Sequence, residues 1–244
     1  QEGFYTLSAK VRDVDLRCSK ALKISNIFQQ KVHYELESAV CLDVGCSSGD
    51  ITAELASLFS RTLGLDYDKV ALQRVTCKKK QSVTFFRGDA MHLPFKKASV
   101  DVIICAQVYE HVPDASRMFS QIYQVLKPGG VVFFSGPNWL FPIEPHYLLP
   151  FLHWLPLSLA DGYLRLMGKG EHYYERLYHY WKLRRLLGNF IVQDVTVDVL
   201  RQSHIHNAFW LRYIPTIVWR MLLPLFPNFN WVLYKPVSNS RTRS

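Results

Sequence analysis

The chain has 244 residues, of which 49% are hydrophobic, 20% charged and 14% aromatic, and this composition excludes an intrinsically disordered protein. There are 29 lysines and arginines against 20 aspartates and glutamates, so the net charge at pH 7 is +9. Residues 151–244 contain 12 of the basic and 5 of the acidic residues, so the C-terminal third carries +7 of that charge. The length predicts one large domain with additions rather than two complete domains.

The five cysteines have neither metal-type spacing nor the even number of a disulfide framework, which favours a reducing compartment such as the cytoplasm. No signal peptide is recognised at the start. The two longest apolar stretches, residues 139–160 and 208–227, are interrupted by prolines, and the second also by two arginines. Neither stretch is therefore expected to span a membrane.

The predicted elements alternate between strands and helices through the middle of the chain, which is typical of a parallel sheet covered on both faces. Residues 1–37 predict one or two helices, such as 21–34, that pack over one end of the sheet. Strands are expected at residues 40–43, 61–66, 83–87, 100–105 and 131–136, with helices at 50–60, 69–79 and 116–126 between them. A helix at 173–187, a half-exposed strand at 190–199 and an edge strand at 231–234 are expected to follow.

These elements predict an α/β fold, a Rossmann-like doubly wound and mostly parallel seven-stranded sheet. Its expected parts are an N-terminal helical cap (1–37), a cofactor-binding core (38–138), an aromatic lid (139–171) and a C-terminal completion of the sheet (172–244). The last part contains an apolar and basic insertion at residues 200–229.

A turn of small residues follows the first strand in the sequence CLDVGCSSGD, residues 41–50. Asp43 ends the buried strand, and Gly45, Ser47 and Gly49 precede a helix. Small residues let a backbone approach a ligand closely, and a helix N-terminus offers free N–H groups. A tight turn without a ligand is the alternative. A dinucleotide site would need G-x-G-x-x-G, which this spacing does not match.

Further polar side chains are expected at the carboxyl ends of the neighbouring strands. Asp66 ends the second strand in LGLDYD, where a carboxylate can accept hydrogen bonds from two ribose hydroxyls. Asp89 follows the third strand in RGDAMHLPF, and the segments DVIICAQVYEHVPD and LKPGGVVFFSGPN carry the fourth and fifth strands to the same edge. Each feature alone is weak evidence, but the five in this order indicate one ligand site.

These residues resemble the class I S-adenosylmethionine-dependent methyltransferases, in particular the small-molecule, type 11-like branch that includes quinone, sterol and other lipid methylases. The resemblance covers about residues 38–138 and implies S-adenosyl-L-methionine as the cofactor. No metal site is expected from the sequence. It also implies a role for each matching residue: Asp43, Gly45, Ser47 and Gly49 line the methionine half, Asp66 holds the ribose, Tyr67 packs on the adenine, Asp89 and Ala90 read the adenine edge, and Ala106 and Gln107 lie near the sulfonium. Ser47 departs from the family pattern, in which Gly is usual.

Methyl transfer is an in-line displacement, to which positioning of the nucleophile contributes much of the catalysis. An oxygen or carbon nucleophile also needs a base. Two groups of candidates follow the fourth and fifth strands: Tyr109–Glu110–His111 and Glu144–His146–Tyr147. We expect His146 to act on the acceptor, with His111 and Tyr109 as the other candidate catalytic residues. A structural role for each of these side chains is the alternative.

The insertion at residues 139–170 is expected to be a lid, because it supplies aromatic side chains that suit an apolar or aromatic substrate. They are Trp139, Phe141, Tyr147, Phe151, Trp154 and Tyr163. Residues 206–228 predict an apolar helix with one narrow polar stripe of Arg212, Thr216 and Arg220. Such a helix is either buried, or in an oligomer contact, or bound to an anionic membrane surface.

The leading interpretation is therefore a methyltransferase that acts on a small, lipid-like or aromatic molecule in the cytoplasm, with peripheral membrane binding as a further expectation. Nucleic acid is an unlikely partner, because the amino-directed Asn/Asp-Pro-Pro-aromatic motif and the Pro-Cys nucleophile of nucleic-acid methylases are both absent from the sequence. The alternatives are an RNA or protein methyltransferase that uses the basic C-terminal third, and a non-catalytic protein with the same fold.

Overall fold

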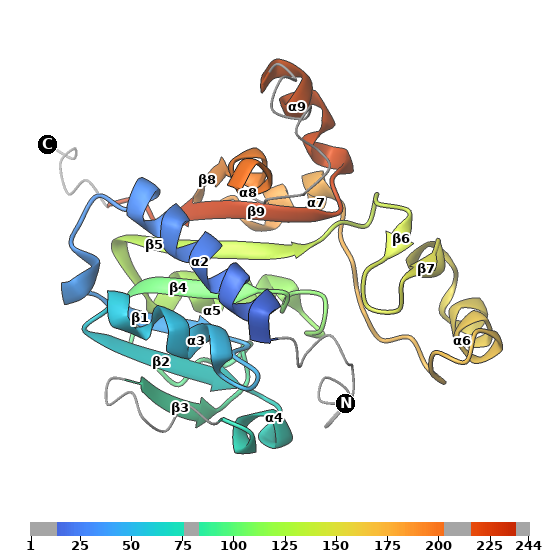
Figure 1. Cartoon of the computed structure of the whole chain (residues 1–244), viewed down its shortest axis with the longest axis horizontal. Helices are drawn as coiled ribbons and strands as arrows, with labels where there is room; N and C mark the ends of the chain where they lie inside the picture. The colour runs from blue at the N-terminus through green and yellow to red at the C-terminus, as the bar shows by residue number, and fades with distance from the viewer. Residues whose placement is uncertain (1–13, 76–82, 203–215, 238–244) are drawn as a thin grey trace, which may run out of the picture.

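The structure, a computed structural model, describes residues 14–75, 83–202 and 216–237 (Figure 1). A seven-stranded sheet in the order β3-β2-β1-β4-β5-β9-β8 forms its centre. The strands from β3 to β5 are parallel, whereas β9 runs antiparallel to β5 and β8, so the predicted Rossmann-like, mostly parallel fold is confirmed. The strands are β1 (Val40–Val44), β2 (Arg61–Asp66), β3 (Val83–Arg87), β4 (Val100–Ala106), β5 (Leu126–Pro137), β8 (Ile191–Asp194) and β9 (Asn228–Tyr234).

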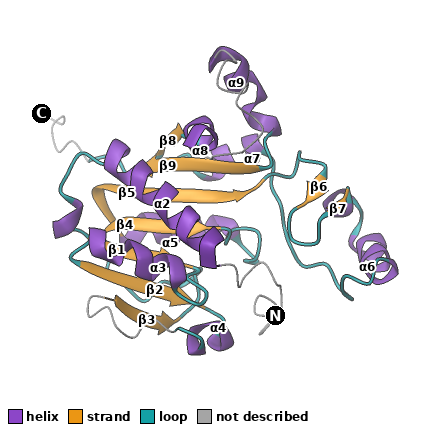
Figure 2. Cartoon of the chain, in the orientation of Figure 1, coloured by secondary structure: helices purple, strands orange, loops and turns teal. Residues whose placement is uncertain are grey.

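Helices cover both faces of this sheet (Figure 2). One layer consists of α2 (Val14–Lys31), α3 (Asp50–Leu55) and α8 (Thr196–Gln202). The other contains α5 (Ala115–Val125) and α7 (Tyr180–Leu186). The short helix α4 (Lys69–Gln73) and the 3-10 turns η2 (Leu36–Ser38) and η3 (Ala56–Leu58) lie in the connections between the first strands.

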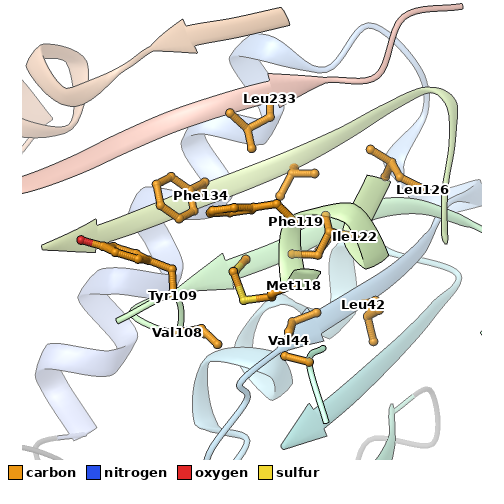
Figure 3. Packing of buried hydrophobic residues seen from close by; sticks show 14 of the residues in the cluster. Leu42, Val44, Val108, Tyr109, Met118, Phe119, Ile122, Leu126, Phe134 and Leu233 are labelled. Carbon is orange, nitrogen blue, oxygen red and sulfur yellow. The ribbon is translucent and has the colours of Figure 1, made fainter. Parts of the chain in front are cut away.

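Successive side chains along a strand point to opposite faces of the sheet, so the core is divided between the two helical layers. In β4, Ile103 and Cys105 belong to the cluster under α5, whereas Val102 and Ile104 belong to the cluster under α2. Figure 3 shows the first cluster, in which Phe134 of β5 lies between the strands and the side chains of α5. The ring of Phe134 contacts those of Phe119, Tyr109 and Trp231 at centroid distances of 5.4, 5.8 and 5.7 Å.

Three expectations about the ends of the chain are wrong in detail. The 231–234 strand is not an edge strand, because β9 pairs with both β5 and β8 and β8 forms the edge. The predicted strand at 190–199 ends at Asp194, whose carboxylate accepts a hydrogen bond from the Thr196 amide at 2.9 Å as α8 begins. The N-terminal helix covers a face of the sheet rather than its end, since Phe28 packs against Phe133 of β5.

Other predicted boundaries shift by several residues. The helix expected at 173–187 begins only at Tyr180, where the His179 side chain caps it by accepting a hydrogen bond from the Lys182 amide. Strand β5 begins at Leu126, directly after α5, and its pairing with β4 shifts register between Val100 and Val102.

Two additions extend from the sheet (Figure 1). The first, the predicted lid, contains β6 (Ile143–Glu144), β7 (Leu149–Pro150), η4 (Leu152–Trp154) and α6 (Leu157–Leu166), and it has a small hydrophobic cluster of its own. The second contains α9 (Thr216–Leu222) and η6 (Leu223–Leu225), which precede β9. The predicted helix over 206–228 is therefore wrong beyond Leu222, and residues 206–215 lie outside the described residues. In the described part of the chain, no helix has the length and apolarity needed to cross a membrane.

Candidate functional site

A cavity of about 1310 Å³ lies at the carboxyl ends of the central strands. Of the residues expected to bind the cofactor, all but Gly49 line it: Asp43, Gly45, Ser47, Asp66, Tyr67, Asp89, Ala90, Ala106 and Gln107. The cavity continues past Val108 to His111 and to the lid residues 145–148. The structure therefore brings the predicted cofactor residues and two of the predicted catalytic residues to one space.

The glycine turn (residues 45–49) needs its small residues for conformational and steric reasons. Gly45 and Gly49 both have a positive φ, 78° and 74°. A Cβ on Gly45 would lie 2.5 Å from Cγ2 of Val108, and one on Gly49 would lie 2.6 Å from the Phe85 ring. Ser47 also has a positive φ of 51°, which L-residues adopt only at a cost of about 1–2 kcal/mol. This backbone conformation gives a physical reason why Gly is the usual residue there.

Asp66 holds together the two loops that form one wall of the cavity. Its Oδ2 accepts a hydrogen bond from the Ser47 amide at 2.7 Å, and its Oδ1 accepts one from the Asp68 amide at 2.8 Å. Each carboxylate oxygen has a second acceptor position, so Asp66 can still accept two hydroxyl donors from a ligand.

Asp43 is buried at the end of β1 and accepts a hydrogen bond from the Thr52 hydroxyl at 2.6 Å. Burial raises the pKa of Asp43 to about 7, and the nearby carboxylate of Asp66 adds to the increase while the Thr52 bond opposes it. A cation bound in the cavity would therefore stabilise the ionised form of this side chain.

The predicted adenine end contains Tyr67, Asp89 and Ala90. Tyr67 is 61% exposed and packs against the Arg87 guanidinium, 5.7 Å from its ring centroid. Asp89 accepts a hydrogen bond from the Met91 amide at 2.8 Å and pairs with His92 at 3.1 Å. Much of the capacity of this carboxylate to accept hydrogen bonds is therefore used within its own loop.

A cluster of two imidazoles and a carboxylate forms the other end of the cavity. His111 and His146 pack edge to face with their ring centroids 4.9 Å apart. The Glu110 Oε1 atom lies 3.7 Å from Nε2 of His111 and 3.9 Å from Nε2 of His146. Burial raises the pKa of Glu110 to about 7 and, together with the neighbouring His146, lowers the pKa of His111 to about 3.

Glu144 orients His146 from the other side. Its Oε1 lies 2.7 Å from Nδ1 of His146, and its Oε2 accepts hydrogen bonds from the amides of His146 and Tyr147, both at 2.7 Å. Burial disfavours the charged form of His146, but the hydrogen bond and the charges of Glu144 and Glu110 outweigh it and raise its pKa. In the neutral form of His146, the proton lies on Nδ1 facing Glu144 and Nε2 presents a lone pair to the cluster.

Tyr109, the third predicted catalytic residue, has a structural position instead. Its side chain is fully buried and lies outside the cavity lining. Its hydroxyl donates to the Pro137 carbonyl oxygen and accepts from the Tyr178 amide at 3.2 Å. Burial also raises the pKa of Tyr109 well above its usual value, which disfavours a role as a base.

Most aromatic residues of the lid pack against one another rather than into the cavity. Trp154 contacts Trp139 and Phe151 at ring-centroid distances of 5.8 and 5.0 Å. Of the lid aromatics predicted to meet a substrate, only Tyr147 is in the cavity lining, next to Leu148.

Sequence reasoning missed the lysines of the cavity wall. Lys20 and Lys23 of α2 and Lys169 after α6 line the cavity. No local motif marks them, because their position depends on how α2 and the lid pack against the sheet. The spacing of Lys20 and Lys23, three residues apart, predicts only that they share a helix face.

The family model described as a methyltransferase domain matches residues 42–134. The chain is 37% identical over 184 residues to the demethylmenaquinone methyltransferase of Lactiplantibacillus plantarum, covering 72% of this chain and 74% of that protein. It is 32% identical over 148 residues to the ubiquinone biosynthesis O-methyltransferase of Nitrosococcus oceani, covering 59% of each.

Other curated relatives are matched over a smaller share of their length. The chain spans 43%, 42% and 58% of three of them. Among solved structures, an S-adenosylmethionine-dependent methyltransferase from Mesorhizobium loti has a TM-score of 0.57 at 17% identity, covering 91% of this chain and 99% of that one. This likeness shows the fold.

Asp43→Asn is expected to raise the melting temperature of the ligand-free protein at pH 8. The folded state of the wild type binds the Asp43 proton more tightly than the unfolded state, because the pKa rises from 3.8 to about 7. The folded wild type therefore loses stability progressively as the pH rises from about 4 to about 7, and the loss is complete above that range. The variant lacks this penalty, and its amide oxygen can still accept the Thr52 hydrogen bond.

Scanning fluorimetry at pH 5 and pH 8 measures the effect, and the melting-temperature difference should be larger at pH 8. Asp198→Asn, which changes a partly exposed carboxylate of α8 that lies 3.6 Å from the Lys31 ammonium, is the matched control and should show the same difference at both pH values. A variant less stable than the wild type at pH 8 would contradict the argument.

Proposed function

Because the chain belongs to the class I S-adenosylmethionine-dependent methyltransferases, we propose that it transfers a methyl group to an oxygen, nitrogen or carbon atom of a small, lipid-like or aromatic molecule. The observation that carries the proposal is the single cavity that joins the glycine turn to the His111–His146 pair. Pockets for one drug-sized ligand measure about 300–1,000 Å³, so a cavity of about 1310 Å³ has room for a cofactor and a second molecule.

The residues of the first half of the cavity fit S-adenosyl-L-methionine, which supplies a methyl group on a positively charged sulfur. Gly45 lines the cavity, and because it has no Cβ its loop can lie directly against Val108 on the neighbouring loop. Asp66 retains two acceptor positions for the ribose hydroxyls. Asp43 is a buried carboxylate that a ligand ammonium would neutralise. Tyr67 and Ala90 line the same wall and would contact the adenine.

The second half of the cavity would hold the acceptor. Ala106 and Gln107 lie where this half begins, and the Gln107 amide donates to the Ser135 carbonyl oxygen at 2.8 Å. Beyond them, Nε2 of His146 is the polar atom best placed to accept a proton or a hydrogen bond from the acceptor, because Nδ1 is held by Glu144. In-line transfer then depends on how firmly this side holds the acceptor against the methyl group.

A small apolar acceptor fits this end better than RNA does. Val112 and Leu148 line the cavity beside His111 and His146, and Phe133 and Phe226 add further apolar surface to the lining. The carboxylates of Glu110 and Glu144 are not part of the lining but lie buried behind this end, where their negative charge would disfavour a phosphate. The demethylmenaquinone and ubiquinone-pathway names of two relatives point to the same class, a ring with a long apolar tail.

We also propose that an anionic membrane surface binds the apolar exterior of α9. Ile217 and Met221 are 65% and 75% exposed, and Leu225 of η6 is 56% exposed. Trp219 is buried instead and packs on Phe226, with ring centroids 5.5 Å apart, which fixes the helix with its other apolar side chains outward. Anionic lipids would in addition attract the C-terminal third, which has a net charge of +7.

Asp66→Ala should weaken S-adenosylmethionine binding by at least about tenfold. Hydrogen bonds to a charged group contribute about 1.5–3 kcal/mol each, and Asp66 would lose two of them. Calorimetry measures the affinities, with Asp198→Ala as the control that should bind as the wild type does. If the wild type does not bind the cofactor, or if Asp66→Ala binds equally well, the assignment fails.

His146→Ala should lower the turnover number on the order of 100-fold while the cofactor dissociation constant stays within about twofold of the wild-type value. Transfer of a labelled methyl group is measured with a demethylmenaquinol, a prenylated catechol and a short RNA as acceptors. His172→Ala is the control, since this histidine pairs with Asp161 on the outside of the lid. Methylation of the RNA alone would contradict the proposed substrate class, and an unchanged rate would remove His146 from the reaction.

The double substitution Ile217→Ser with Met221→Ser should reduce co-sedimentation with anionic vesicles several-fold. Binding by the wild type should be weaker to neutral vesicles and at raised salt, which screens the charge. Leu22→Ser is the matched control, because Leu22 is also 65% exposed but lies on α2. A wild type that does not bind vesicles under any of these conditions would contradict the membrane proposal.

A further inference from the structure

Glu110, His111 and His146 form a compact group of potential metal ligands that the proposed methyl transfer does not by itself require. One ligand atom from each of the three residues lies within 4.8 Å of the others. Glu110 and His111 follow β4, whereas His146 comes from the lid between β6 and β7, so the group forms only where these two loops meet. Sequence spacing gives no sign of it, because His146 is 35 positions from His111.

The Glu110 carboxylate is the least satisfied polar group in this part of the protein. Its side chain is fully buried, and neither oxygen accepts a hydrogen bond from any described residue. The described groups within 4 Å of it that can carry a positive charge are the two imidazoles. A buried carboxylate without hydrogen bonds is costly unless a cation compensates its charge.

The hydrogen bond between His146 and Glu144 has the form that supports a metal-binding histidine. Ligating imidazoles usually donate their second N–H to a carboxylate, which fixes the ring and directs the other nitrogen toward the metal. Here Nδ1 of His146 lies 2.7 Å from Glu144 Oε1, and two backbone amides hold the second oxygen of Glu144 at 2.7 Å each. Nε2 of His146 is therefore fixed on the side of Glu110 and His111.

We propose that Glu110, His111 and His146 bind one divalent transition-metal ion of the zinc type, with at least one coordination position open to the cavity. Two imidazoles and one carboxylate favour zinc, iron, cobalt or nickel over magnesium and calcium, which prefer oxygen ligands. His111 and His146 both line the cavity, whereas Glu110 lies behind them. The fourth position therefore faces the space where an acceptor would bind.

Metal binding needs only small movements of the three side chains. Ligand atoms around one zinc ion lie about 2.0–2.2 Å from the metal and therefore about 3.4 Å from one another. The two distances from Glu110 Oε1, 3.7 and 3.9 Å, already approach that value. No two of the three ligand atoms are more than 4.8 Å apart, so the most distant pair has to move closer by less than about 1.5 Å. Side-chain rotations can provide such a movement.

The functional consequence rests on the proposed methyl transfer. An open metal position would bind a hydroxyl oxygen of the acceptor and lower its pKa, so that its proton passes to water in the cavity. The resulting oxygen would be held near the methyl group, which it displaces from the sulfonium. His146 Nε2 would then act as a metal ligand, so the metal would replace it as the group that polarises the acceptor. This favours a phenol, an enol or a catechol, because a metal-bound oxygen loses its proton and keeps a lone pair for attack, whereas an amine would spend its one lone pair on the metal.

The test uses untagged full-length protein dialysed against a chelator, then titrated with zinc by calorimetry and with cobalt(II) by visible absorption. We expect one equivalent to bind with a dissociation constant at or below micromolar, and with the intense bands of a low-symmetry cobalt site. Glu110→Gln and His111→Ala should each weaken binding by on the order of 100-fold or more. His172→Ala, which removes an exposed histidine paired with Asp161, should bind as the wild type does.

Glu110→Gln keeps the shape of the side chain, so the folded variant can be compared directly with the wild type. Zinc should raise the melting temperature of the wild type and of His172→Ala, but not that of Glu110→Gln. A wild type that binds no metal, or a Glu110→Gln variant that binds it as tightly, would overturn the proposal. Calorimetry of cofactor binding to the metal-free protein tests the proposed methyltransferase function separately from the metal site. Either result can be negative while the other is positive.

Discussion

The position of β1 between β2 and β4 in a parallel sheet is the constraint on which the site depends. Parallel pairing places the carboxyl ends of all three strands at one edge, so that their loops must pack against one another. The Asp66 carboxylate joins the loops after β1 and β2 through the Ser47 amide. The absence of a Cβ on Gly45 allows the loop after β1 to lie against Val108 of the loop after β4. One wall of the cavity is therefore a consequence of strand order.

Buried carboxylates surround the cavity although the chain as a whole is positively charged. The chain carries +9, yet the cavity includes the buried carboxylate of Asp43, and Glu110 and Glu144 lie buried behind its other end. Buried carboxylates without cations reduce the stability of the ligand-free fold, and bound cations offset that cost. The cofactor is positively charged at its sulfur and its ammonium group, and the metal proposed beside Glu110 is also a cation. Binding and folding are therefore coupled through the same side chains.

The sequence predicted the parts of the fold that local patterns determine. Strands β1, β2, β4 and β5 are largely buried and therefore appear in the sequence as apolar runs, whereas the edge strand β3 is only partly buried. The glycine turn needs small residues, and these are visible in its own sequence. The interior position of β9 could not be predicted, because it depends on pairing with β8 and with β5, from which residues 138–227 separate it. Tyr109 was misassigned for a similar reason: only the packing of the 172–179 segment shows that the Tyr178 amide occupies its hydroxyl.

The two halves of the cavity are formed by different parts of the chain, because the loop after β4 meets the lid at one end. The fold of the sheet alone therefore does not determine the reaction. The first half of the cavity is formed by loops of the sheet, whose geometry every strand in the order β2-β1-β4 helps to fix. The second half includes residues 145–148 of the lid, which packs mainly on its own cluster around Leu152 and Leu164. A change in the lid sequence could therefore alter the acceptor side, including the position of His146, and leave the cofactor side unchanged. In the proposed methyl transfer, acceptor specificity would therefore depend on the lid and its contact with Glu110 and His111 rather than on the sheet.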